Sequence, residues 1–155
     1  MSMIGIFGRC SKSNYDKLAD LIKSEDSAKT EDLIKDIYSE VENSAAKLEN
    51  AKCSGEVFIA LFHYLETACG VDVRYGTEEV AEKWRDTTGD FDVILFHEKE
   101  QVLALEDTID YDGLMQFIND FFQIDSGNAG QIAWDVLLNN IKGTGTENIL
   151  IWHLF

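Results

Sequence analysis

One stretch constrains the fold of this chain more than any other: residues 56–69, EVFIALFHYLETAC, contain neither glycine nor proline and are mostly apolar. At 100° per residue, Glu56, Ala60, His63 and Thr67 of such a helix fall on one narrow strip, and the rest of its surface is apolar except Glu66. Ser54 is placed to cap its start, and Gly70 suits a left-handed turn at its end. The run is too short and too interrupted by charge to cross a bilayer. The pattern therefore predicts a central helix, apolar on most sides, that other elements cover.

Further helices are indicated by apolar residues at three- and four-residue spacing. They are expected over about 13–24, 30–50, 111–124 and 129–142, with a short, weaker one between Thr77 and Arg85. Ser13 with Asp16 could form a capping box for the first of them. Asp110 or Asp112 could cap the helix that begins near 111, and Gly143 would close the last one.

Strands are expected at both ends of the chain and in its middle. Residues 2–10 form a short apolar run whose Gly5 and Gly8 suggest close approach of another element. A short strand over 71–75 and an antiparallel hairpin of 91–97 with 101–106 follow, and 149–154 form a terminal strand. The sequence therefore predicts one α+β domain over residues 1–155. Its small, mostly antiparallel sheet would combine the first strand, the hairpin and the last strand, packed with about five helices.

The charge of the chain limits its partners. The 155 residues carry 13 Lys and Arg against 29 Asp and Glu, a net charge of −16. Nucleic acid and anionic membranes would be repelled, so neither is expected as a ligand. A cationic protein partner, or high solubility alone, fits this charge. Three cysteines without metal-binding spacing indicate free thiols in a reducing cytoplasm.

Catalytic motifs are missing from the sequence. There is no GxSxG, P-loop or dinucleotide fingerprint, and DTIDYDG at 107–113 lacks the alternation and closing Glu of a calcium loop. His63 could be a base oriented by a carboxylate, but a solvent-facing histidine is the simpler interpretation. We therefore expect no enzyme activity, no cofactor, no metal and no catalytic residue.

Acidic residues are concentrated in the middle of the chain. Residues 86–135 contain twelve acidic side chains and one basic one, whereas the first fifty residues have a net charge of only −3. A solvated face is one explanation. Interleaved aromatics favour another, an interface with an aromatic anchor and a charged rim. The residues expected to bind a partner are Asp90, Asp92, Glu98, Glu100, Asp107, Asp110 and Asp112.

Two resemblances accompany these patterns. MSMIG at the start, SGEVFIALFHYLET at 54–67 and VRYGTEEVAE at 73–82 resemble the bacterial YfbM-like family of unknown function, over roughly the first half of the chain. The overall profile is similar to immunity proteins of contact-dependent inhibition and other polymorphic toxin systems. That likeness implies a small cytoplasmic protein that blocks the active site of a cationic nuclease toxin.

The leading hypothesis from the sequence is thus an immunity protein, a monomer or weak dimer, that neutralises a basic toxin. The alternative is a small hydrolase or a YfbM-like ligand-binding domain of unknown substrate.

Overall fold

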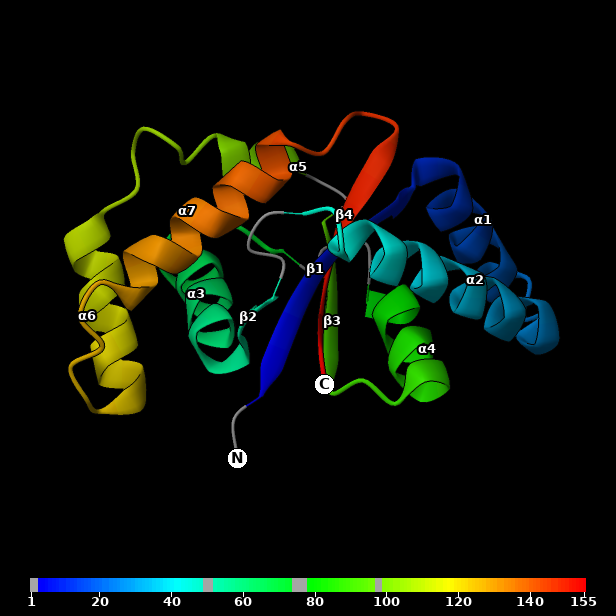
Figure 1. Ribbon diagram of the computed structural model, residues 1–155, viewed down its shortest axis with the longest axis horizontal. Helices are drawn as coiled ribbons and strands as arrows, with labels where there is room; N and C mark the ends of the chain where they lie inside the picture. The colour runs from blue at the N-terminus through cyan, green and yellow to red at the C-terminus, as the bar shows by residue number, and fades with distance from the viewer. Residues whose placement is uncertain (1–2, 49–51, 74–77, 97–98) are drawn as a thin grey trace.

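The computed structural model describes residues 3–48, 52–73, 78–96 and 99–155, and the arrangement of its elements is drawn in Figure 1. In chain order the elements are β1 (Ile4–Ser11), α1 (Lys12–Lys23), α2 (Ser27–Ala45), β2 (Lys52–Ser54), α3 (Gly55–Thr67), α4 (Glu78–Thr88), β3 (Asp92–Phe96), α5 (Lys99–Leu103), α6 (Tyr111–Phe122), α7 (Ala129–Lys142) and β4 (Asn148–Leu154). The fold is α+β, as the sequence predicts.

The four strands form one antiparallel sheet in the order β2-β1-β4-β3. The terminal strand β4 lies between β1 and β3, with Trp152 opposite Phe7 on one side and Ile94 on the other. The expectation that the last strand joins the first in one sheet is therefore confirmed. Figure 1 shows α3, α5, α6 and α7 on one side of the sheet and α1, α2 and α4 on the other.

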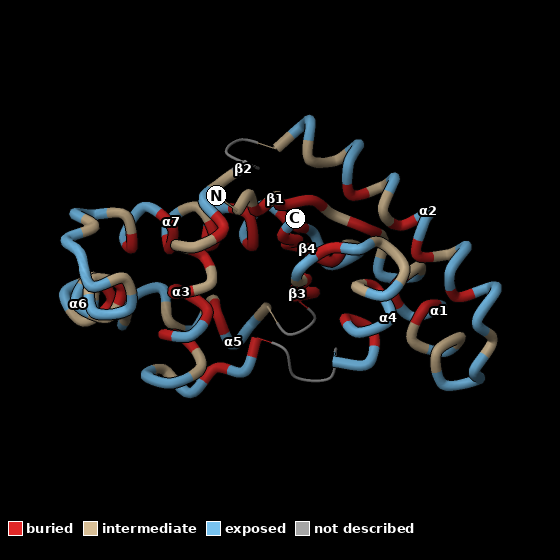
Figure 2. Tube along the Cα trace, turned by 90° about the horizontal axis from the view of Figure 1, so that it is seen from below, coloured by how far each residue is buried: buried red, intermediate tan, exposed pale blue. Residues whose placement is uncertain are grey.

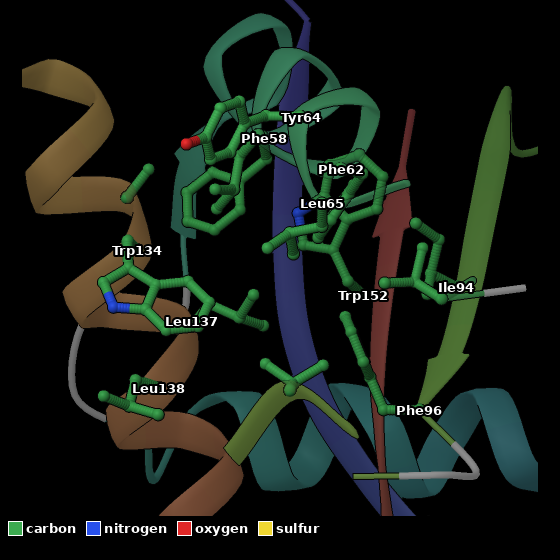
Figure 3. Close-up of a cluster of buried hydrophobic side chains, with 14 of the residues drawn as sticks. Phe58, Phe62, Tyr64, Leu65, Ile94, Phe96, Trp134, Leu137, Leu138 and Trp152 are labelled. Carbon is green, nitrogen blue, oxygen red and sulfur yellow. The ribbon is translucent and has the colours of Figure 1, made fainter. Parts of the chain in front are cut away.

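The first face of the sheet is covered by the central helix α3. Phe58, Leu61 and Leu65 of α3 are buried at 3%, 0% and 0% exposure, which confirms the predicted core helix. Trp152 packs edge-to-face on Phe62, with ring centroids 4.9 Å apart. Figure 3 shows Phe58, Phe62 and Leu65 of α3 meeting Trp152 and the side chains of α7 in one cluster.

The second face of the sheet is covered by α1, α2 and α4, whose buried side chains form a separate cluster with the strands. At Gly8 a Cβ atom would lie 2.5 Å from both the side chain and the carbonyl oxygen of Val41, so α2 approaches β1 where β1 has no side chain. This confirms the role predicted for that glycine. Figure 2 shows buried residues concentrated at the sheet and exposed ones on the outer faces of the helices.

The predicted hairpin is wrong. β3 pairs with β4, and the segment expected as the second hairpin strand forms α5 and the turns after it. Val102 of α5 is buried in the cluster formed by α3, α7 and the sheet, so this apolar run packs a short helix against the core. The structure describes seven helices where about five were expected.

Smaller differences concern strand β2 and the helix ends. β2 was not predicted, and Val71–Val73 form no strand, while 74 and 75 lie outside the described residues. Helix α1 is capped by Ser11, which accepts a hydrogen bond from the amide of Asn14, and not by the expected Ser13. Ser54 precedes α3 without a side-chain cap, whereas Gly70 has the expected positive φ of 69°.

Candidate functional site

The candidate site is an acidic surface, residues 100–135, formed by α5, the following turns, α6 and the first half of α7. Helix α6 begins at Asp110, whose side chain accepts a hydrogen bond from the amide of Gly113 at 3.0 Å. This confirms one of the two predicted caps. Leu114 and Ile118 are fully buried against the core, which leaves the opposite face of α6 to solvent. Figure 1 places α6 as the outermost element on its side of the sheet.

This surface carries no basic side chain of its own, since residues 100–135 contain eight acidic residues and no Lys, Arg or His. Two lysines lie beside it, and both already have partners. Lys142 pairs with Glu106. Lys99 donates to the backbone carbonyls of Thr144, Gly145 and Asn148 at 3.4, 3.0 and 3.4 Å. Most of the negative charge therefore faces solvent without a counter-charge.

Apolar side chains are exposed within the same acidic surface. Phe121 is 45% exposed and Ile124 is 65% exposed, both at the end of α6. The ring of Phe121 lies 5.8 Å from that of His63 and 6.5 Å from that of Phe117, which orders it from two sides. Gln123 ends the helix in the left-handed conformation and directs the chain away after Phe122. An exposed aromatic held in place among carboxylates is typical of an interface anchor.

The predicted partner-binding residues divide into two groups. Glu100, Asp107, Asp110 and Asp112 are exposed on the acidic surface. Asp90 and Asp92 lie near the start of β3, at the opposite end of that strand from α5. Glu98 lies outside the described residues. The seven therefore do not form one continuous surface.

Asp90 is the clearest correction. It was expected at an exposed interface, but it is only 7% exposed. Its Oδ2 accepts hydrogen bonds from Trp84 Nε1 at 2.8 Å and from His153 Nδ1 at 3.2 Å. Asp92 is half-buried and pairs with Arg85 at 3.4 Å. Asp90 therefore accepts hydrogen bonds inside the protein and is not available to a partner. The charge of Asp92 is already balanced by that of Arg85.

The Asp90 cluster was not foreseen from the sequence. Tyr38 packs beside it, with its ring centroid 5.7 Å from Trp84 and 5.4 Å from His153. Burial, with a further contribution from the charge of Asp90, raises the pKa of Tyr38. His153 is 2% exposed, and its Nε2 is buried with no hydrogen-bond partner among the described residues. A buried pair enclosed in this way supports the sheet and is not accessible to a substrate.

His63 is exposed, as the simpler interpretation expected. The carboxylate that could have oriented it, Glu56, accepts a hydrogen bond from the Met3 amide at 3.0 Å and another from Ser54 Oγ at 3.2 Å. These contacts lower the pKa of Glu56, with the Met3 amide the largest cause. His63 instead contacts an aromatic ring of α6. The geometry required of a catalytic base oriented by Glu56 is therefore not present.

Neither a metal centre nor a membrane span emerges from the described parts of the chain. No group of three or more His, Cys, Asp or Glu side chains is arranged there to hold an ion. None of the helices there has both the length and the apolar character needed to cross a bilayer.

Comparison with known protein families finds no matching family model, and comparisons with curated proteins and solved structures likewise give no match. The functional argument therefore rests on the charge and geometry of this chain.

Proposed function

We propose that this protein is a cytoplasmic immunity protein that binds a cognate cationic toxin, with a nuclease as the leading case, and occludes its active site. The observation that carries the proposal is the acidic surface 100–135, with eight acidic residues, no basic residue and an exposed Phe121. Cys10, Cys53 and Cys69 are free thiols, which fits a reducing compartment.

The mechanism follows from what a nuclease groove recognises. Such a groove binds phosphates with Lys and Arg side chains, and carboxylates can occupy the same positions. The unneutralised field of the acidic surface would steer the encounter and raise the association rate. Phe121 and Ile124 would then be buried at the centre of the contact, which lowers the dissociation rate.

The first test identifies the partner by affinity capture from the native strain, followed by expression of the captured toxin domain. Association rates are then measured by stopped flow at two or more salt concentrations. A variant carrying Glu100→Gln, Asp107→Asn and Asp112→Asn should associate about tenfold more slowly at low salt and show a flatter salt dependence.

The matched control removes the same number of charges from the other helix layer: Asp16→Asn, Asp20→Asn and Asp36→Asn, all exposed on α1 and α2. It should change the association rate little. If the control variant slows binding more than the acidic-surface variant, or if neither does, the interface lies elsewhere. Phe121→Ala should mainly raise the dissociation rate, by about tenfold or more.

A further inference from the structure

A second surface feature has the opposite charge. A cavity of about 500 Å³ lies where the end of α7, the start of α1 and α5 meet, and Lys12, Lys99 and Lys142 line it. Ile141 and Ile149 contribute apolar walls, and Glu100 is the acidic residue on its rim. Thr144, Thr146 and Asn148 of its lining belong to the segment that leads from α7 into β4, and Figure 1 shows this segment at one end of the sheet.

The convergence of cations is unusual for this chain. Lys99 and Lys142 are the only Lys or Arg residues between 99 and 155. Lys12 reaches the same cavity from the first helix, and Arg9 approaches from β1, where its Nε donates to Thr144 Oγ1 at 3.0 Å. In a protein of net charge −16, four of the 13 Lys and Arg side chains thus gather at one place.

The protein satisfies only part of this positive charge. The carbonyls after α7 accept from Lys99, and Glu106 pairs with Lys142. These contacts stabilise the end of α7, as cations at a helix C-terminus do. The ammonium of Lys12 and the two Nη groups of Arg9 have no partner among the described residues.

The electrostatic environment agrees with this geometry. Burial lowers the pKa of Arg9, although no carboxylate is bonded to it. Burial also lowers the pKa of Lys99, and the charges of Arg9 and Lys12 add to this effect, whereas Glu100 opposes it. Gathering like charges at a partly buried place is unfavourable unless an anion offsets them.

We infer that this cavity binds a small organic anion through a phosphate or carboxylate group, with Lys12, which lines the cavity, as the principal charge partner. The apolar walls would contact the organic part of the ligand, in the way that small-molecule sites combine apolar surface with a few polar groups. The site lies apart from the exposed anchor on α6, and the inference does not depend on the proposed function.

The test uses the full chain and three probes, inorganic phosphate, phenyl phosphate and benzoate, in isothermal titration calorimetry at constant ionic strength. Saturable binding of at least one probe below about 10 mM is expected. Phenyl phosphate should bind more tightly than inorganic phosphate because of the apolar walls. The relative affinities of phenyl phosphate and benzoate then distinguish a phosphate ligand from a carboxylate ligand. Amide chemical shifts of Thr144 and Asn148 should move on binding.

The variant Lys12→Gln with Lys142→Gln should weaken the Kd at least tenfold. Its fold is expected to survive, because Lys12 is unpaired and the Lys142 pair is an exposed one. The matched control, Lys23→Gln with Lys35→Gln, removes two exposed lysines elsewhere and should leave the Kd within twofold. No saturable binding to the unmodified protein, or equal weakening by both variants, overturns the inference.

Discussion

Single side chains decide how the interior is held together at the start of β3. Asp90 supplies one oxygen to two buried donors, Trp84 Nε1 and His153 Nδ1. Because a carboxylate only accepts hydrogen bonds, His153 presents Nδ1–H to it and Nε2 is left without a partner. Removing one member of such a buried group leaves the others desolvated and unpaired.

We therefore expect Asp90→Ala to lower the free energy of unfolding by about 3 kcal/mol, measured by urea denaturation. Asp90→Asn should cost less, since an amide oxygen can still accept from Trp84. The control is Asp86→Ala, an exposed residue of the preceding helix α4, which should stay within about 0.5 kcal/mol. A loss below 1 kcal/mol for Asp90→Ala would show that the two hydrogen bonds are dispensable.

The three thiols should differ in reactivity. Burial raises the pKa of Cys10 to about 12 and that of Cys53 to about 11, and it raises that of Cys69. Only the thiolate reacts with iodoacetamide, and at pH 8 the thiolate fraction of Cys10 is on the order of 1 in 10,000. Cys69, the least buried in its surroundings, should be alkylated first and Cys10 last. Each rate should increase as the pH rises.

Mass spectrometry of samples quenched at intervals gives the order of alkylation, and a sample in urea, where all three should react alike, is the control. Fast labelling of Cys10 in the folded protein would contradict its position in the core.

At the scale of elements, the central helix α3 contributes many of the buried side chains in the core between the sheet and α7. Phe58→Ala or Leu61→Ala should each lower the free energy of unfolding by about 2–5 kcal/mol, because both side chains are buried. Ile132→Ala, an apolar truncation at a 54% exposed position of α7, is the matched control and should cost under about 1 kcal/mol. Denaturant melts in which all three variants lose the same amount would refute the assignment of α3 to the core.

The contact between α2 and β1 depends on the absence of a side chain. Gly8→Ala would place a Cβ 2.5 Å from the Val41 carbonyl oxygen, so helix and strand must separate. We expect a loss of about 1–3 kcal/mol in thermal or urea unfolding. Gly145→Ala has nothing within 4 Å of the added atom and should be nearly neutral. Equal stability of the two variants would mean that α2 can move without cost.

These elements also show what a sequence can predict. The long helices were found because their apolar residues repeat at helical spacing, which packing preserves. The segment 101–106 was misjudged because a short apolar run fits a strand and a buried helical turn equally well. The three residues of β2 are too few to carry a pattern. Asp90 and His153 are in contact although 63 positions separate them in the sequence, and no local sequence pattern indicates that contact.

The candidate sites show the same limit. The acidic surface was visible in the sequence because its residues are contiguous along the chain. The cationic cavity was not, because Lys12, Lys99 and Lys142 come from three distant segments. A site whose residues lie in one segment can be predicted from the sequence. A site whose residues come from distant segments can be recognised only once the fold is known.

Across the whole molecule, charge is distributed unevenly over the two helix layers. Helices α1 and α2 interleave lysines with their acids, whereas residues 100–135, which form the acidic surface, contain no Lys or Arg. Repulsion among unneutralised carboxylates opposes the compact state, and salt screens it. The free energy of unfolding should therefore rise by about 1 kcal/mol between about 0.02 and 0.5 M sodium chloride.

The origin of that salt effect can be located with two charge variants measured in urea at both salt concentrations. Asp107→Asn, Asp112→Asn, Asp120→Asn and Asp125→Asn together should remove a large share of the gain, because these exposed side chains form no ion pair with the described residues. The same number of changes on the other layer, Asp16→Asn, Asp20→Asn, Asp36→Asn and Glu42→Gln, should remove less, since lysines on α1 and α2 already offset them. If salt does not stabilise the protein, solvent alone disperses the repulsion. The acidic surface would then carry no stored unfavourable energy for a cationic partner to relieve, and its contribution to binding would be limited to steering.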